Sequence, residues 1–256
     1  SEQTVTTGEV VAAFLEACGV QAAFGVISIH NLPMLDALGR RGKIRFVPSR
    51  GEAGAVNMAD AYARIRGELG VAFTSTGTGA GNAAGAMIEA ETAGTPVLHL
   101  TGQIDLPHLD RGRGYIHETK AQLEMLRAVS KAAYRVLSPE SALRVLREAV
   151  STALTAPTGP VSVEIPADVQ AATLPMPVGL SPLQVVISHP GEIALDQLAE
   201  RLATAKRPLL WLGGGARHAR EGAIRLVECG IGMVTSVNGR GIVPEDHPLT
   251  LGAFNM

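Results

Sequence analysis

Short apolar segments that alternate with helix-like stretches are the feature that most restricts the fold of this sequence. The apolar runs at 22–27, 70–74, 96–101 and 160–165 are each short enough to form a single strand. Most of them lead through a turn into a stretch with the apolar spacing of a helix. This alternation predicts an α/β fold with a mostly parallel, doubly wound sheet and helices on both faces.

The stretch from Ile44 to Gly67 carries the first chemical signal. An apolar strand at 44–47 ends at Pro48, which cannot continue a strand ladder, and the helix that follows ends at Gly67. Glu52 stands at the start of this helix, just past the carboxyl end of the strand, where open α/β sheets bind ligands. A glutamate in the first helical turn can also do no more than complement the helix dipole.

A Gly-rich loop at 76–82 is the second candidate site, because it follows a strand and opens a helix. Backbone N–H groups at such a helix start can cradle an anion or a cofactor. The glycines can equally serve only a tight turn. The loop also passes weakly as a dinucleotide fingerprint, but no acidic residue stands at a strand end about 20 positions further on.

Composition argues against several classes of partner. The formal net charge of −2 at pH 7 gives no electrostatic reason to expect nucleic acid or an anionic membrane. No apolar run approaches the length of a membrane span, and we expect no signal peptide before Thr6. The two distant cysteines, Cys18 and Cys229, fit free thiols in a reducing compartment better than a disulfide. We therefore expect a cytoplasmic protein.

The proline-rich stretch at 169–190 predicts an interdomain linker. It separates a first domain at 1–168 from a second α/β domain, of which residues 191–256 form the start. The strands and helices expected after residue 191 are too few to complete a sheet of this kind. We therefore interpret the chain as part of a longer protein whose second domain is incomplete here.

Several segments resemble thiamine-diphosphate enzymes of the acetolactate synthase type. Residues 49–64 read Ser-Arg-Gly-Glu-Ala-Gly-Ala-Val-Asn-Met-Ala-Asp-Ala-Tyr-Ala-Arg, which is similar to the family's Arg-His-Glu-x-x-Ala-x-x-Met-Ala-Asp-Gly-Tyr-Ala-Arg. The 76–82 loop resembles the Ser-Gly-Pro-Gly-x-x-Asn loop that contacts the cofactor's aminopyrimidine. Residues 102–103 and 112–118 resemble segments that border the substrate pocket. The resemblance implies a pyrimidine-binding domain followed by the start of a central domain.

The resemblance also implies roles for single residues. Glu52 corresponds to the catalytic carboxyl group that lies against ring nitrogen N1′ of the cofactor. His117 replaces a Gln of the family's Phe-Gln-Glu segment, and His30 stands in the turn after the first strand, where the family often has Pro-Gly. Both histidines are candidate catalytic residues in the pocket. The other expected cofactor contacts are Thr76, Gly77, Thr78, Asn82 and Gln103.

The implied activity is decarboxylation of a 2-oxo acid, after which the enamine is joined to a second carbonyl compound. The family holds Mg²⁺ and the diphosphate through a Gly-Asp-Gly…Asn motif, and this chain has no Gly-Asp-Gly. We therefore expect that site outside this chain, in a C-terminal domain of a partner subunit. This implies a homodimer or homotetramer with shared active sites. An exposed Gly- and Ala-rich helix face at 53–63 would favour the same association.

The second domain leaves the question of FAD open. Its segments resemble those through which acetolactate synthase holds FAD, although many relatives bind no flavin. The residues concerned are Gly213, Gly214, Gly215, Ser236, Val237 and Asn238. Two alternatives of other classes remain, namely a nicotinamide- or flavin-dependent oxidoreductase that uses the 76–82 loop and a noncatalytic binding module of the same fold.

Overall fold

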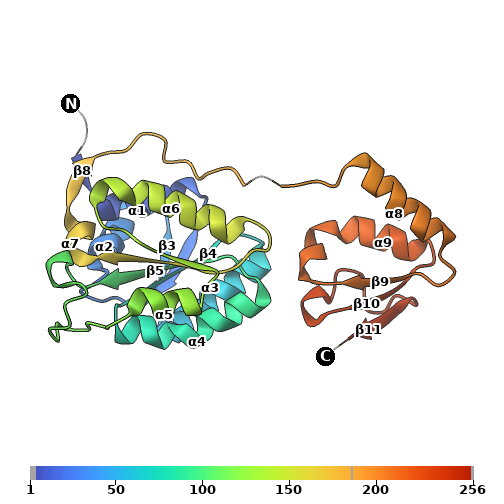
Figure 1. The fold of residues 1–256 in the computed structure, drawn as a ribbon, viewed down its shortest axis with the longest axis horizontal. Coiled ribbons are helices and arrows are strands. Elements are labelled where there is room, and N and C mark those ends of the chain that lie inside the picture. Colours follow the sequence, from blue (N-terminus) through green and yellow to red (C-terminus); the bar gives the residue numbers. More distant parts are fainter. Residues whose placement is uncertain (1–3, 186, 255–256) are drawn as a thin grey trace. The chain divides into compact units, whose positions relative to one another are not determined.

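A six-stranded parallel sheet forms the centre of the first of two units in this chain (Figure 1). The structure is a computed structural model that describes residues 4–185 and 187–254. The first unit extends to residue 186 and the second begins at residue 187. The parallel sheet confirms the α/β fold expected from the alternating sequence pattern.

The order of strands in the sheet is β3-β2-β4-β5-β7-β6. The chain first moves outward from β2 to β3 and then returns to place β4 on the other side of β2, so the order reverses between β2 and β4. Ligands bind at such a reversal in open α/β sheets. The strands are β2 (Ala22–Gly25), β3 (Arg45–Pro48), β4 (Gly70–Thr74), β5 (Val97–Gln103), β6 (Ala132–Arg135) and β7 (Val161–Pro166).

Helices cover both faces of this sheet (Figure 1). One face carries α1 (Thr7–Ala17), α2 (Leu32–Arg41) and α6 (Pro139–Leu154), and its core includes Phe14, Phe73 and Leu146. The other face carries α3 (Glu52–Arg66), α4 (Thr78–Ala93) and α5 (Gln122–Ala128).

The alanines of α3 point inward. Ala55, Ala59 and Ala63 are buried, and the first two belong to a core cluster with Met87 of α4 and Ala72 of β4. Small side chains let α3 and α4 pack closely on each other and on the sheet. The expectation that this helix face is exposed was therefore wrong, because its apolar surface is already covered within the chain.

A two-stranded antiparallel sheet joins the ends of the first unit. β1 (Thr4–Thr6) pairs with β8 (Thr173–Pro175), which follows the short helix α7 (Ala167–Ala171). Val5 and Leu174 share a small core with Val10. Residues 169–175, which the prolines suggested as linker, thus pack as part of the first unit.

The second unit contains a three-stranded parallel sheet of order β11-β10-β9. Val227 of α9 packs against the sheet beside Met233 and Val243. In contrast, α8 has no buried residue. The elements are α8 (Glu192–Thr204), β9 (Leu209–Leu212), α9 (Arg220–Glu228), β10 (Gly232–Thr235) and β11 (Thr250–Ala253), with 3-10 turns at Gly214–Ala219 and Val237–Gly239.

Candidate active site

Two loops are joined at the point where the strand order reverses. The Asn31 amide nitrogen donates to the carbonyl oxygens of Val26, at 2.9 Å, and Thr74, at 3.0 Å. The Ser28 and Ser75 hydroxyl oxygens lie 2.7 Å apart. These bonds hold the chain after β2 against the chain after β4. Side chains thus fix the loops at the carboxyl ends of these strands, where open α/β sheets bind ligands.

Glu52 is the first residue of α3, and its carboxylate lies over the first turn of α4. Asn82 donates from Nδ2 to Glu52 Oε2 at 3.3 Å. Gly79 leaves space for the other oxygen, since a Cβ atom at position 79 would stand 2.8 Å from Glu52 Oε1. Glu52 is half-buried. The carboxylate therefore contacts the start of α4 through Gly79 and Asn82 and remains accessible.

The glycine-rich loop packs directly on the segment that carries His117. Gly77 has a φ of +57°, which favours glycine, and a Cβ atom there would stand 2.1 Å from the carbonyl oxygen of His117. His117 itself has a φ of +63°. Only a residue without a side chain fits at position 77, and this close contact brings His117 beside the loop.

The side chain of Gln122 holds the same loop from within the protein. Its Oε1 accepts hydrogen bonds from Thr76 Oγ1, at 2.7 Å, and from the Gly77 N–H, at 2.6 Å. Its Nε2 donates to the Gly102 carbonyl, at 3.2 Å, and to Glu164 Oε2, at 2.9 Å. Gln122 is only 1% exposed. A buried amide thus uses both of its acceptor positions and both of its donors.

Glu164 is a fully buried carboxylate on β7, and its counter-ion is Arg135 of β6. Arg135 donates from Nε to Glu164 and from Nη1 to Asp110 at 2.8 Å. Burial lowers the pKa of the Arg135 guanidinium, but Glu164 and then Asp110 raise it, and the net shift is upward. This pairing lets the carboxylate remain in the interior, where an unpaired charge would be costly.

Gln103 and Thr78 differ in their access to a ligand. Gln103 is 2% exposed, and its Oε1 accepts from the Ile104 N–H at 2.8 Å. It also lies 3.1 Å from Thr76 Oγ1, which shares its single hydrogen between Gln103 and the nearer Gln122. Protein groups therefore use the side chain that the sequence suggested for cofactor contact. Thr76 is also buried, whereas Thr78 is exposed at the start of α4.

His30 and His117 form a pair of imidazoles with ring centroids 5.3 Å apart. His30 is 4% exposed, and its Nδ1 has no hydrogen-bond partner within the described residues. Burial lowers the pKa of His30, His117 lowers it further, and Asp105 opposes the shift. The lowered pKa favours the neutral imidazole, and its unpartnered Nδ1 is buried away from solvent.

In the second unit, the loops after the adjacent strands β9 and β10 approach each other. A Cβ atom at Gly214 would stand 3.2 Å from Asn238 Cβ, and one at Gly213 would stand 3.9 Å from Ser236 Oγ. Gly215 has open space around it, and Val237 is exposed. The predicted flavin segments therefore lie together at the carboxyl end of a parallel sheet.

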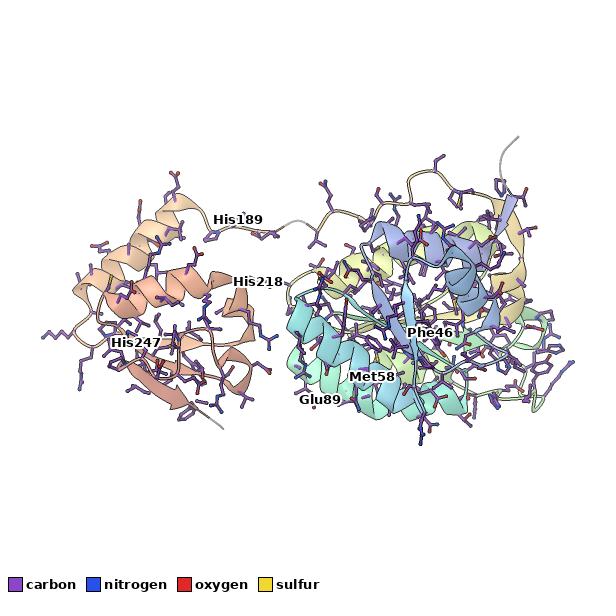
Figure 2. The ribbon with its side chains drawn as sticks, turned by 180° about the vertical axis from the view of Figure 1, so that it is seen from behind. Phe46, Met58, Glu89, His189, His218 and His247 are labelled. Atoms are coloured by element: carbon purple, nitrogen blue, oxygen red, sulfur yellow. The ribbon has the colours of Figure 1, made fainter. Side chains whose placement is uncertain are left out.

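The remaining histidines do not form a metal centre within the described part of the chain. His189, His218 and His247, labelled in Figure 2, belong to the second unit. Across residues 4–185 and 187–254, no group of three His, Cys, Asp or Glu side chains could hold a metal ion. Among the same residues, no helix combines the length and apolarity needed to cross a membrane.

Sequence reasoning did not single out Gln122, Glu164, Arg135 or Asn31. A signal for one of them exists, because Glu164 is the one charged residue of a fully buried strand and a charge in such a strand requires a buried partner. The identity of that partner lies far along the chain and has no local pattern.

Comparison with known proteins gives consistent matches along the chain. The family model for the N-terminal TPP binding domain of thiamine pyrophosphate enzymes matches residues 5–125, and the model for their central domain matches residues 195–256. The chain is 36% identical over 258 residues to a probable 2-ketoarginine decarboxylase of Pseudomonas aeruginosa, covering 98% of this chain and 45% of that protein.

Two acetolactate synthases show similar agreement. The chain is 32% identical over 259 residues to the probable large subunit of Methanocaldococcus jannaschii, covering 97% of this chain and 43% of that protein. It is 33% identical over 253 residues to acetolactate synthase 2, chloroplastic, of Zea mays, covering 94% of this chain and 38% of that protein. The chain thus spans less than half the length of these curated relatives.

Proposed function

Because this chain belongs to the thiamine pyrophosphate enzyme family, we propose that the protein containing it decarboxylates a 2-oxo acid and then protonates the product or joins it to a second carbonyl compound. The observation that carries this proposal is the Glu52 carboxylate, held by Asn82 and facing Gly79 at the ligand-binding edge of the sheet. The names of the relatives support the 2-oxo-acid class.

The residues around Glu52 fit the aminopyrimidine of thiamine diphosphate. Gly79 presents bare backbone beside the carboxylate, and a side chain there would fill the space next to Glu52 Oε1. Asn82 holds Glu52 Oε2 without neutralising its charge. When bound, the cofactor supplies an acidic carbon that adds to a ketone and an electron sink for loss of CO₂.

Each protein group then has a defined task. Glu52 would hold the cofactor's aminopyrimidine and would share a proton with its ring nitrogen N1′ through the carboxylate oxygens. Thr76, Gly77 and Thr78 form the loop that would hold the cofactor's ring, and the Gln103 side chain packs against Thr76 from the protein interior. His117 stands beside this loop with the His30 ring next to it, and the two imidazoles would face an anionic substrate.

The binding site for the diphosphate and Mg²⁺ is proposed to lie outside the described residues. A doubly charged group needs a cation and several donors, and these residues hold no cluster suited to a metal. We therefore propose that another part of the protein supplies this site, in a homodimer or homotetramer with shared active sites. The exposed Ile65 of α3 and Ile88 of α4 favour a partner surface on these helices.

FAD and location are further parts of the proposal. The adjacent loops of the second unit, with Gly213 to Gly215 on one and Ser236 to Asn238 on the other, suit a flavin nucleotide held at the carboxyl ends of parallel strands. The free thiols of Cys18 and Cys229 support a reducing compartment such as the cytoplasm.

The test of the central proposal is Glu52→Gln in the full-length protein. A glutamine of the same shape cannot share a proton with N1′, so deuterium exchange at the reactive carbon of bound thiamine diphosphate should slow by about 10²–10⁴-fold. Glu89→Gln is the matched control, because Glu89 is an exposed residue of α4 (Figure 2). A wild-type exchange rate in the Glu52 variant would remove Glu52 from the mechanism.

A further inference from the structure

The buried amide of Gln122 connects groups that are distant in the sequence. It accepts a hydrogen bond from the Gly77 N–H at 2.6 Å and donates one to Glu164 at 2.9 Å. Since it bonds at the same time to Thr76 and to the Gly102 carbonyl, no rotation of this side chain keeps all four bonds. Gln122 therefore fixes the position of the glycine-rich loop relative to the sheet.

Displacement of this loop would reach Glu52 through a short path. The Gly79 N–H donates to the Thr76 carbonyl at 3.0 Å, so the first turn of α4 follows Thr76 and Gly77. Gly79 in turn stands against Glu52 Oε1. Gln122 does not contact Glu52. It nevertheless determines the position of the backbone at Gly79, against which the Glu52 carboxylate lies.

The same amide is itself anchored by charge. Glu164 accepts from Gln122 and from Gln103, and it is bonded to Arg135, which also binds Asp110. A fully buried carboxylate with these partners can turn very little, because each broken bond would leave a polar group without water. The anchor gives Gln122 a rigid base.

We propose that Gln122 is a positioning residue for the cofactor site, which sets the glycine-rich loop and thereby the place of the Glu52 carboxylate. This rests on the proposed function for its effect on thiamine diphosphate. Its effect on the loop does not depend on any cofactor.

The first experiment compares hydrogen exchange of the cofactor-free full-length protein and its Gln122→Met variant. The methionine keeps the volume and removes all four bonds, so exchange at residues 77–79 should rise while the peptides of α1 and β2 keep their protection. Gln170→Met is the matched control. Gln170 is also fully buried, but it donates to His30 and Ile165. That variant should leave residues 77–79 unchanged.

The second experiment measures thiamine diphosphate affinity by calorimetry with Mg²⁺ present. Gln122→Met should weaken binding by about 10-fold or more. A Gln122→Glu variant separates positioning from general destabilisation. A neutral carboxyl group can still accept from Gly77 and donate to Glu164, whereas an ionised one cannot donate and is repelled by Glu164. Two other charged or titratable groups near position 122 are Arg135, which is paired with Glu164, and His117, which lies beside Gly77.

Burial and the neighbouring Glu164 should raise the pKa of a glutamate at position 122. The affinity of the Gln122→Glu variant relative to wild type should therefore increase as the pH falls from about 8 to about 6. Wild-type exchange at residues 77–79 in Gln122→Met, or a Gln122→Glu affinity that follows wild type at every pH, would overturn the proposal. If Gln122→Met does not fold, the pH response of Gln122→Glu decides. Failure of the wild-type protein to bind thiamine diphosphate would instead refute the proposed function, and the exchange comparison would still test Gln122.

Discussion

Gly79 faces the Glu52 carboxylate so closely that one added methyl group would stand 2.8 Å from Oε1. The same methyl group would stand 2.6 Å from Ser75 Cβ. The backbone around Ser75 cannot retreat easily, because Ser75 is buried and bonded to Ser28. The position of Glu52 therefore depends on the absence of a side chain in the neighbouring helix.

We expect Gly79→Ala to reduce cofactor-dependent kcat by about 10- to 100-fold, because displacement of a reacting group by about 1 Å has an effect of that size. Gly81→Ala is the control. It lies on the same helix with open space around it, and alanine should stabilise the helix there by about 0.5–1 kcal/mol. Equal activity of the two variants would contradict the close contact.

A pH effect on stability should come from His99 of β5. His99 is fully buried between Thr74 Oγ1, at 2.8 Å, and Ser162 Oγ, at 3.0 Å, and burial lowers its pKa to about 4. The unfolded chain takes up a proton near pH 6.5 and the folded one does not, so stability falls as pH drops from about 6.5 to about 4. The full loss is roughly 3 kcal/mol.

Urea unfolding at several pH values measures this effect. His99→Asn removes the titration and should flatten the slope of unfolding free energy between about pH 6.5 and about pH 4.5, whatever its effect at pH 7. His218→Asn, at an exposed site in the second unit, should keep the wild-type slope. Identical slopes for wild type and His99→Asn would show that His99 does not carry the dependence.

Lys131 closes the carboxyl end of α6. Its Nζ donates to the carbonyl oxygens of Thr152, Thr155 and Pro157, each at 2.7 Å. These carbonyls lack helical donors, and a cation there also complements the helix dipole. Lys131→Met should lower the unfolding free energy of the first unit by about 1–3 kcal/mol.

Chemical denaturation would measure this loss, with Lys43→Met as the comparison. Lys43 has a side chain that is 70% exposed and lies 3.5 Å from Glu16. Exposed ion pairs contribute about 0–1 kcal/mol, so the Lys43 variant should change little. A Lys131 variant as stable as the Lys43 variant would mean that water replaces the ammonium group at no cost.

Purified full-length protein should carry flavin absorbance if the loops of the second unit hold FAD. Gly214→Val would add side-chain atoms toward Asn238, since even a Cβ atom there stands 3.2 Å from Asn238 Cβ, and should lower flavin occupancy. Gly222→Val on α9, where the surroundings are open, is the control. Wild-type protein without any flavin absorbance would remove FAD from the proposal.

Shared active sites predict complementation between two inactive chains. One chain carries Glu52→Gln and the other is disabled only in its diphosphate site. A mixed dimer would contain one intact site, so mixing with subunit exchange should restore part of the activity. Exchange confirmed by mass, without any recovery of activity, would refute shared sites.

Local patterns predicted the framework of this molecule well. The run at 70–74 became β4 with the same bounds, and the helix that begins at Glu52 ends before Gly67, which adopts a left-handed φ of +67°. Each signal is local, since apolar spacing and a helix-ending glycine act within a few residues. The comparisons confirm the resemblance to thiamine-diphosphate enzymes.

Long-range partners were beyond local patterns. Nothing near Gln122 indicates that it will bond to Gly77 and Glu164, which stand 45 and 42 positions away. The α3 alanines show the same limit, because their spacing correctly marks an apolar face and does not say what covers it. The roles of Glu52, His30 and His117 stay predictions until they are tested by substitution.

The pairing of β1 with β8 has a consequence for synthesis of the protein. Val5 pairs with Leu174, so β1 must wait for a strand that is made much later. At about 5–20 residues per second, ribosomes need roughly 10–30 s to make the intervening chain. During that interval Val5 and Val10 lack the cover of Leu174. Nascent chains stalled before residue 173 should therefore bind chaperones around β1, and chains stalled well after residue 175 should release them.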